Sequence, residues 1–535
     1  MEIDSIIKLL LKNRSVQTKK QIEEFFHPAH PKDIKTPFDS KPAIRLIKAH
    51  IKKGHKIAIY GDYDVDGICS TAIAWETLYS VYKNVFPHIP HRESEGYGLS
   101  TKGIDHCLEQ GAKLIIAVDS GIVAYDQVKY CQDKGCDIII IDHHEAGSPL
   151  NTKYLIHNTS SCAAGLTWLF CRDYVLSCHP ERSRGIPPLA SLSRDDKLEL
   201  VAIASICDIV PLLGPNRSFV KYGLEELHRT SRPGLLALFS EAGLSIMNHE
   251  PITPYHVGFI IGPRLNAAGR LEHAIDSLRL LCTKDPKRAQ QLAASIGQTN
   301  RDRQEETLSA ITHAMNQLTN NQLTNLIIAA DKSYHQGVIG LVAAKLVEKY
   351  HRPAIAISIG ELESKGSARS VSGFHITDHL RTAQDLLLNI GGHAMAAGFT
   401  VENSQLEALI AKLTAIEIDP KLLVKTQRVD AEIPLSAVGY ELSAKLKAFE
   451  PFGLGNPTPV FSTPGVEISD IRRIGKDNKH IKFIAGGLDA IWFNAPLDAI
   501  RSTLDAVDLV YQIEENSWNG QTKLQLLIKD VRQSS

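Results

Sequence analysis

The stretch that decides the fold of this chain is residues 56–67, Lys-Ile-Ala-Ile-Tyr-Gly-Asp-Tyr-Asp-Val-Asp-Gly. A short apolar run suited to a buried strand is followed at once by Asp62, Asp64 and Asp66. In an extended segment alternate side chains face the same way, so these carboxylates are expected to converge. Like charges so placed repel each other unless a cation neutralises them. The stretch therefore predicts a cation site at a strand end, with a solvated surface cluster of acids as the alternative.

The surrounding sequence, from about residue 42 to 160, alternates apolar strand-like runs with segments of helix length. This alternation predicts the α/β class, with a parallel sheet covered by helices on both faces. In such sheets, ligands bind beyond the carboxyl ends of the strands. The other strands expected in this sheet cover residues 84–90, 113–118, 137–141 and 153–157.

Acidic and imidazole side chains follow two more of these strands. Asp119 follows the strand at 113–118, and Asp142-His143-His144 follows the strand at 137–141. A lone aspartate at a strand end is usually a helix cap and a lone histidine is usually structural, but the repetition at successive strands weakens that interpretation. Asp208 ends an apolar helical segment, where an acid is costly unless it is paired or coordinating.

Together these residues predict an oxygen-rich metal site with one or two imidazoles. Carboxylates favour Mg²⁺ or Mn²⁺, and an added histidine shifts the preference toward Mn²⁺. Five or more acids are too many for one small ion, so we expect two ions roughly 3.5–4 Å apart. Such a pair suits phosphodiester hydrolysis because it activates water and clamps the attacking and leaving oxygens.

The rest of the chain divides by composition and periodicity. Residues 177–196 are rich in Pro, Ser and Arg, which predicts an exposed loop insertion, with a basic DNA-contacting loop as the alternative. A long helix is expected from Pro286 to about Leu318. The expected divisions are an N-terminal segment (1–40), a catalytic α/β domain (41–215), a helical region with the long connecting helix (216–320), a second α/β domain (321–420) and a β-rich barrel or sandwich (421–535).

Composition indicates a globular enzyme rather than a disordered or fibrous chain, with 43% apolar and 22% charged residues. The formal net charge of −1 gives no support to nucleic-acid binding. The apolar runs are of strand length, so no membrane span is expected. Nine cysteines without a CxxC pair, and an N-terminus without a secretory signal, predict a cytoplasmic protein with reduced thiols.

The motifs resemble those of the DHH phosphoesterase superfamily, and their order resembles its RecJ branch. The resemblance covers nearly everything from about residue 40 to the end. The four catalytic motifs correspond to GDYDVDG (61–67), VDSG (118–121), IDHHE (141–145) and ASICDIVPL (204–212). The other matching stretches are GPRLNAAGRL (262–271), GSARSV (366–371), GGHAMAAG (391–398) and PFGLGNP (451–457).

The resemblance implies that Asp64, Asp66, Asp119, His143 and Asp208 are metal ligands, with Asp119 bridging both ions. Asp62 is expected to join the site or lie directly behind it. Asp142 is expected to orient His143, and His144 to face the scissile phosphate. Tyr60 stands where the pyrophosphatase branch has a histidine ligand, which argues against a pyrophosphatase.

The resemblance also implies substrate contacts. Arg369 and Ser370 are expected to hold a terminal 5′-phosphate, since Arg binds phosphate bidentately. Gly391, Gly392 and His393 are expected to let the DNA backbone approach closely, because glycine carries no Cβ. Arg264, Asn266 and Arg270 are candidates for contacting the strand, with structural salt bridges as the alternative. The C-terminal β-rich region resembles an OB-type single-strand-binding module.

The function implied is a 5′→3′ exonuclease that degrades single-stranded DNA with two metal ions in DNA repair and recombination. Its expected partners are single-stranded DNA, a helicase and a single-strand-binding protein, and a monomer is expected. One alternative is a DHH phosphodiesterase of short oligonucleotides or cyclic dinucleotides, although such relatives lack the C-terminal β-rich region. Another is a non-catalytic replication scaffold, although scaffolds typically lose metal ligands that are all present here.

Overall fold

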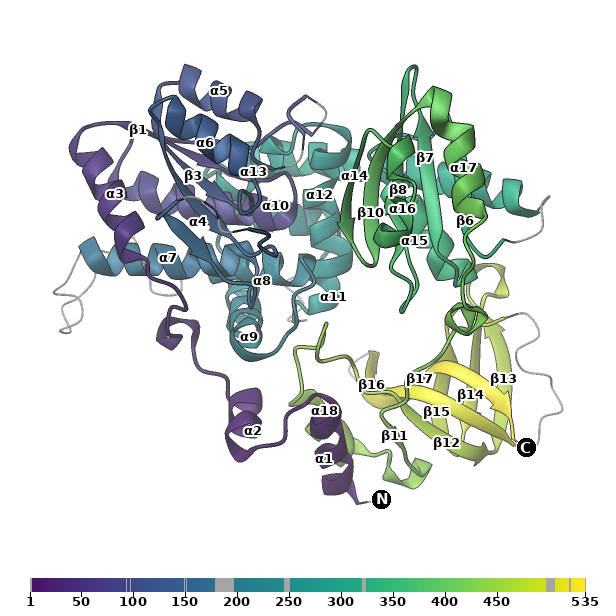
Figure 1. Ribbon diagram of the computed structural model, residues 1–535. Helices are drawn as coiled ribbons and strands as arrows, with labels where there is room; N and C mark the ends of the chain where they lie inside the picture. Colours follow the sequence, from purple (N-terminus) through teal and green to yellow (C-terminus); the bar gives the residue numbers. More distant parts are fainter. Residues whose placement is uncertain are drawn as a thin grey trace.

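The structure, a computed structural model, builds three β-sheets from successive parts of the chain over the residues it describes (Figure 1). It describes all residues except 1, 93, 97, 149, 151, 179–196, 245–250, 320–323, 497–505, 519–520 and 535. The expected loop insertion at 177–196 therefore lies almost entirely outside the described residues. Two α/β lobes lie side by side in Figure 1, and the C-terminal sheet lies below them.

The first sheet has the order β2-β1-β3-β4-β5 and its strands are all parallel, which confirms the fold class predicted for this region. Alternate residues of each strand point to opposite faces. Ile57 and Ile59 therefore join one buried core, and Ala58 and Tyr60 join another on the opposite face. The strands are β1 (Lys56–Tyr60), β2 (Val85–His88), β3 (Ala112–Val118), β4 (Asp137–Asp142) and β5 (Leu155–His157).

Helices cover both faces of this sheet, as the alternating pattern predicted. Residues of α4 and α7 share the core that contains Ile57, whereas residues of α5 and α6 share the core that contains Ala58. The helices of this unit are α3 (Lys41–Lys52), α4 (Val65–Val81), α5 (Thr101–Glu109), α6 (Tyr125–Asp133) and α7 (Ala163–Cys178).

A helical region follows and ends in the long helix that the sequence predicted, α14 (Pro286–Thr319). This helix contacts α10, α12 and α13 of the first lobe and also α15 and β6 of the second lobe, so it joins the two lobes (Figure 1). The preceding helices are α8 (Leu198–Cys207), α9 (Gly214–His228), α10 (Pro233–Glu241), α11 (Pro254–His256), the π-helix η4 (Val257–Ile261), α12 (Gly262–Leu271) and α13 (Ile275–Cys282).

The second lobe is a mixed sheet of order β6-β7-β8-β10-β9. Its glycine-rich run at 391–398 lies in the antiparallel hairpin of β9 and β10. Gly392 has φ +142°, and a Cβ there would lie 2.3 Å from the Ala396 carbonyl oxygen, so the hairpin requires glycine. The elements are β6 (Ile327–Asp331), α15 (Ile339–Tyr350), β7 (Ala354–Ile359), β8 (Glu363–Arg369), α16 (Ile376–Arg381), β9 (Asn389–His393), β10 (Ala396–Glu402) and α17 (Leu406–Thr414).

The C-terminal region forms a seven-stranded sheet of order β11-β12-β16-β17-β15-β14-β13, with α18 (Tyr440–Lys447) beside it. This agrees with the β-rich domain that the sequence predicted. The strands are β11 (Ala431–Glu432), β12 (Phe461–Val466), β13 (Ile468–Ile474), β14 (His480–Ala485), β15 (Leu488–Trp492), β16 (Val507–Trp518) and β17 (Gln521–Gln533).

The two N-terminal helices, α1 (Ile3–Asn13) and α2 (Lys19–Phe26), pack on the C-terminal domain. Ile6, Leu10 and Phe25 share one buried core with Phe449 and Phe461. This joining of the two ends of the chain was not predicted, because an amphipathic helix does not reveal which surface covers its apolar face. Among the described residues, none of the helices combines the length and hydropathy that crossing a membrane requires.

We expect Leu10→Ala to destabilise the C-terminal domain by about 2–5 kcal/mol, because truncating a buried leucine leaves a cavity. Leu10 is fully buried in the core that the N-terminal helices share with the C-terminal domain. Hydrogen-exchange mass spectrometry on peptides covering β12 and β16 measures this local stability. The control is Leu308→Ala, because Leu308 is 65% exposed. Equal hydrogen exchange of these peptides in both variants would show that α1 does not stabilise the C-terminal domain.

Candidate metal centre

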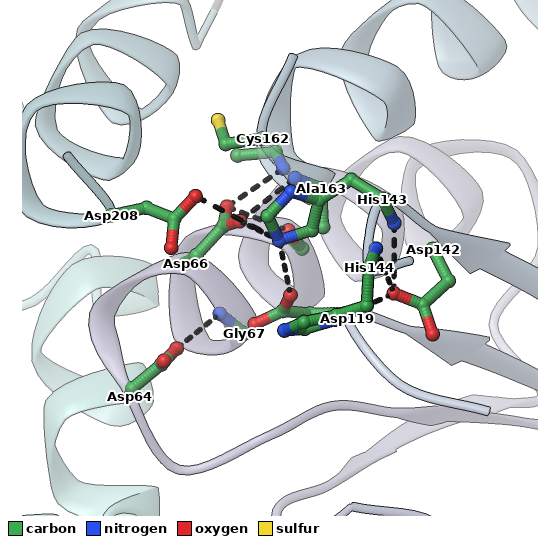
Figure 2. Close-up of polar contacts among 12 residues, drawn as sticks. Asp64, Asp66, Gly67, Asp119, Asp142, His143, His144, Cys162, Ala163 and Asp208 are labelled. Atoms are coloured by element: carbon green, nitrogen blue, oxygen red, sulfur yellow. Dashed lines mark hydrogen bonds and ion pairs between the residues drawn. The ribbon is translucent and has the colours of Figure 1, made fainter. Parts of the chain in front are cut away.

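The first group of acids lies in the turn between β1 and α4. Asp64 is the N-cap of α4, and its Oδ1 accepts a hydrogen bond from the Gly67 backbone N–H at 3.0 Å (Figure 2). Asp66 lies in the first helical turn and accepts from the N–H groups of Ala163 and Ala164 at 2.7 and 2.8 Å. A Cβ at Gly67 would lie 2.6 Å from the Asp62 backbone, so glycine is needed for the turn to close. The local fold thus fixes the carboxylates of Asp64 and Asp66.

Asp119 follows β3 in an uncommon backbone conformation. Its φ is +61°, a left-handed value that non-glycine residues rarely adopt. Its backbone N–H continues the sheet by donating to the Ile141 carbonyl at 2.9 Å. Outliers of this kind cluster at functional sites, where the surrounding structure enforces them. The strained turn aims the Asp119 carboxylate toward the residues at the end of β1 and β4 (Figure 2).

Asp142, the last residue of β4, organises the turn that carries both histidines. Its carboxylate accepts from the backbone N–H groups of Ile122 and His143 at 2.9 and 2.8 Å and lies 2.8 Å from Nδ1 of His144. The structure therefore differs from the expectation that Asp142 orients the His143 ring. The ring it orients is that of His144, because the tight turn directs only the backbone N–H of His143 toward Asp142.

The His143 ring lies at the centre of the acidic groups. Its Nε2 is 3.4 Å from Asp119 Oδ1, 3.7 Å from Asp66 Oδ2 and 3.7 Å from Asp208 Oδ2 (Figure 2). Asp208 reaches this point as the C-cap of α8. Side chains from three other segments of the chain therefore converge on one imidazole nitrogen.

Three overlapping sets of potential ligands result, and Asp119 belongs to two of them. One set is Asp66, His143 and Asp208, a second is Asp62, Asp64 and Asp119, and a third is Asp119, His143 and His144, with the ligand atoms of each set within 4.8 Å of one another. Asp119 also approaches the first set through its contact with His143. This arrangement could hold two cations that share Asp119.

The electrostatics of the centre fit divalent cations. Asp62, Asp66 and Asp119 are almost fully buried. Burial and the neighbouring Asp64 raise the pKa of Asp62 to about 8, and burial together with Asp66 raises the pKa of Asp208 to about 8. Asp62 Oδ2, Asp119 Oδ1 and His143 Nε2 are buried without a hydrogen-bond partner. Such groups are costly unless they are paired or coordinate a metal, and this donor set suits Mn²⁺ or Mg²⁺.

The two histidines of the centre have opposite electrostatic character. Burial lowers the pKa of His143 to about 4, so its ring is neutral and its nitrogen can act as a ligand. The hydrogen bond with Asp142 raises the pKa of His144 to about 9, so that ring is a cation at neutral pH. His144 is thus suited to contact a phosphate oxygen, the role expected from the sequence.

Four arginines form a second feature near the acidic centre. Burial lowers the pKa of Arg270 to about 10, and the charges of Arg92, Arg303 and Arg369 contribute to this lowering. Arg92 lies over the ring of Tyr63, with its guanidinium carbon 5.2 Å from the ring centroid. The Nε of Arg303 is buried without a hydrogen-bond partner. Several guanidinium groups whose charges act on one another favour binding of an anion such as phosphate.

Three of these arginines come from elements at the junction of the two lobes. Arg270 lies on α12, Arg303 on α14 and Arg369 at the end of β8 (Figure 1). Arg270 and Arg369 were predicted from the sequence, whereas Arg92 and Arg303 were missed. Arg92 comes shortly after β2, so its place near a strand end was a usable signal. Arg303 lies in a long charged helix, whose sequence gives no sign of which side faces the site.

The sequence predicted that Ser370 accompanies Arg369 in binding a phosphate, but the structure places Ser367 beside the Arg369 guanidinium. Ser370 is buried, and its hydroxyl donates to the Phe374 carbonyl inside the domain. Ser367 instead lies beside Arg369, whose Nη1 donates to the Ser367 hydroxyl at 3.1 Å. Residues two apart on a strand share a face, so Ser367 rather than Ser370 accompanies Arg369.

Arg264 and Asn266 make contacts within the protein. Arg264 Nε lies 2.8 Å from Glu241 Oε2 in an ion pair, the alternative that the sequence left open. The side-chain oxygen of Asn266 accepts from the Val65 N–H at 3.1 Å and so supports the turn that carries Asp64. Contact with a nucleic-acid strand remains a prediction for both.

The glycine-rich hairpin lies at the edge of the second sheet. Gly391, Gly392 and His393 belong to the edge strand β9, and all three are exposed. A Cβ at Gly391 would meet no atom within 4 Å, so packing does not explain that glycine. The expected approach of a DNA backbone to this strand remains a prediction.

A parallel sheet with these acids and histidines at its strand ends, joined to a second α/β lobe, defines a DHH-type phosphoesterase. Three family descriptions match: "DHH family, N-terminal domain" over residues 56–193, "DHHA1 domain" over 323–417 and "RecJ OB domain" over 429–530. The chain is 34% identical to the single-stranded-DNA-specific exonuclease RecJ of Bacillus subtilis, over 99% of this chain and 68% of that protein. It is 30% identical to the Haemophilus influenzae protein of the same name, over 98% of this chain and 95% of that protein.

The chain belongs to the RecJ family. It also resembles the crystal structure of RecJ in complex with Mn²⁺ from Thermus thermophilus, with a TM-score of 0.82 and 28% identity over 98% of this chain and 76% of that one. The Mg²⁺ complex of RecJ from the same organism gives a TM-score of 0.75 and 26% identity over 98% of this chain and 74% of that one. These relatives bind the two metals that the donor set favours.

We expect Asp119→Asn to have opposite effects on the stability of the folded chain without and with metal. It should remove part of the free-energy cost of burying the acidic cluster, and it should also remove the stabilisation by bound metal. Without metal the variant should melt above the wild type, because burial raises the pKa of Asp119 and the wild type must either bury this charge or take up a proton on folding. Mn²⁺ at a hundredfold excess over Kd should stabilise the wild type by about 2.7 kcal/mol per site, but not the variant. Thermal melting with chelator and with Mn²⁺ measures both effects.

The matched control is Asp126→Asn, which changes an exposed aspartate on α6. It should melt like the wild type under both conditions. An Asp119→Asn protein that Mn²⁺ stabilises as strongly as the wild type would contradict the shared-ligand arrangement.

Proposed function

We propose that this chain is a metal-dependent exonuclease that hydrolyses single-stranded DNA in the 5′→3′ direction. The observation that carries the proposal is Asp119 placed between two sets of ligands, with an arginine cluster nearby. The first feature suits cleavage of a phosphodiester and the second suits binding of a phosphate. The names of the relatives supply the substrate class, and the match of the C-terminal region to the RecJ OB domain supports it.

The residues that would hold metal are Asp62, Asp64 and Asp119 for one ion, and Asp66, Asp119, His143 and Asp208 for the other. Bound divalent ions supply a water of lowered pKa and neutralise charge on the phosphate. The chain holds ligands of both metal sites in position before metal binds. Backbone N–H groups hold the carboxylates of Asp64 and Asp66, and burial keeps the His143 nitrogen unprotonated.

His144 is proposed to donate a hydrogen bond to an oxygen of the scissile phosphate. Asp142 keeps this ring protonated and fixes its direction through Nδ1, so that Nε2 is the atom proposed to meet the substrate. Donors of fixed geometry stabilise the charge that develops on the phosphoryl oxygens more effectively than water does.

The direction of digestion is proposed to come from Arg369, Ser367 and Arg270. A terminal phosphate carries more charge than an internal phosphodiester, so several converging guanidinium groups prefer it. Anchoring the 5′ end at this cluster would present the adjacent phosphodiester to the metal centre. The C-terminal domain would hold the rest of the strand, as OB folds do through a groove and base stacking.

Two alternatives are less well supported. A phosphodiesterase of very short oligonucleotides does not need a C-terminal strand-binding domain, and a scaffold does not need a complete ligand set. Action in DNA repair and recombination as a monomer, with a helicase and a single-strand-binding protein as partners, is part of the proposal. A cytoplasmic location is also proposed, and it is supported by nine cysteines that are all free thiols.

The proposal is tested with end-labelled DNA in the presence of Mn²⁺, Mg²⁺ or chelator. Single strands should shorten from the 5′ end with either metal, whereas duplexes and chelator-treated samples should stay intact. Digestion from the 3′ end, or equal digestion of duplex, would contradict the proposal.

We expect Arg369→Gln to reduce the preference for a 5′-phosphorylated strand over a 5′-hydroxyl strand by about tenfold or more, the loss of roughly 1.5–3 kcal/mol that a charged hydrogen bond contributes. The ratio of kcat/KM values for the two strands measures this preference. The control is Arg381→Gln, an exposed arginine on α16 in the same lobe. An unchanged ratio in Arg369→Gln would show that another site selects the end.

A further inference from the structure

The loop at residues 451–457 of the C-terminal domain has no role in the function proposed above. In the structure it packs on the segment that follows Asp208. The Leu212 N–H donates to the Leu454 carbonyl at 2.7 Å. A Cβ at Gly455, which has φ +76°, would lie 3.2 Å from Pro211 Cβ. The loop therefore packs closely on the segment that follows Asp208.

Two buried arginines, Arg14 and Arg217, hold this loop and the residue before it. Arg14 of the N-terminal region donates to the Asn456 side-chain oxygen at 2.6 Å and to the Pro457 carbonyl at 2.5 Å. Arg217 of α9 donates to the Pro451 carbonyl at 3.4 Å and to the carbonyl of Glu450, the residue before the loop, at 2.8 Å. Guanidinium groups suit this role because their donors form a rigid fork.

Arg217 also ties α9 to the N-terminal region. It is 1% exposed, donates to the Phe25 carbonyl at 2.6 Å and lies over the Phe25 ring at 4.0 Å. Figure 1 shows α9 on the side of the first lobe that is turned toward α2 and the C-terminal sheet. One side chain thus connects the catalytic lobe, the N-terminal helices and the C-terminal domain.

Asp208 needs such support more than the other proposed ligands do. Asp119 and His143 directly follow buried strands, and Asp66 lies in a buried helical turn. Asp208 instead ends α8, and the next residue, Ile209, is 65% exposed with φ +58°. The segment after it is held by the Asn216 side-chain amide, which donates to the Pro211 carbonyl at 3.0 Å, and by the loop at 451–457.

We propose that Arg217 and the loop at 451–457 position Asp208, so that the C-terminal domain sets the affinity of the metal site formed by Asp66, His143 and Asp208. This inference rests on the proposed function and adds a second task for the C-terminal domain besides holding the strand. Arg217 is a positioning residue, because it acts on the site through the loop and Asp208.

The test compares two substitutions that impose the same kind of backbone strain within the C-terminal domain. Gly455→Ala adds a Cβ against Pro211, whereas Gly487→Ala adds one at φ +87° with no atom within 4 Å. Mn²⁺ binding to the full-length chain is followed by electron paramagnetic resonance of the free ion. Gly455→Ala should weaken one of two Mn²⁺ sites by about tenfold, as the loss of a ligand's supporting contacts does. Gly487→Ala should bind Mn²⁺ like the wild type.

A second pair of substitutions tests the contact between Arg217 and the loop. Arg217→Gln should weaken the same Mn²⁺ site, and Arg229→Gln, at the exposed end of the same helix, should not. Circular dichroism reports whether each variant folds, and if Arg217→Gln does not fold, the glycine pair decides. Wild-type Mn²⁺ affinity in Gly455→Ala, or equal weakening in both glycine variants, would overturn the inference.

Cleavage of single-stranded DNA by the wild type, measured alongside, separates this inference from the proposed function. A wild type that binds two Mn²⁺ ions but does not cleave would refute the function while the glycine pair still decides the inference. A wild type that cleaves while both glycine variants bind Mn²⁺ normally would refute the inference alone.

Discussion

The properties of the metal centre follow from the mutual repulsion of the carboxylates that the fold buries around Asp119. Strands β1, β3 and β4 end at the same edge of the sheet, so the acids that follow or end these strands lie close together. Burial raises the pKa of Asp62, Asp66 and Asp119, which means that the charged forms are unfavourable without a counterion. Divalent cations remove this cost. The same repulsion that makes the metal-free centre unfavourable therefore makes it selective for positive charge.

Much of the fold could be predicted because the informative residues lie at strand ends. The apolar run at 56–60 coincides with β1, and Asp119 and Asp142 lie at the ends of the next strands as expected. Parallel strands place their carboxyl ends at one edge, so the convergence of the acids followed from their order in the chain. The direction of each side chain within a tight turn could not be predicted from that order. Asp142 consequently holds the ring of His144 rather than that of His143.

Features built across distant segments could not be predicted in the same way. The arginine cluster joins α12, α14, β8 and the loop after β2, and no local pattern reveals that these elements meet. The N-terminal helices pack on the C-terminal domain, at the other end of the chain. The sequence could have predicted Ser367 rather than Ser370 beside Arg369, since strand alternation places residues 367 and 369 on one face. The resemblance to known motifs indicated the stretch but not the side of the strand.

The most direct measurement of the central claim is anomalous diffraction at the manganese edge from crystals grown with Mn²⁺. Two peaks roughly 3.5–4 Å apart, both within bonding distance of the Asp119 carboxylate, are the result this account predicts. A single peak, or two peaks of which one does not contact Asp119, would contradict it.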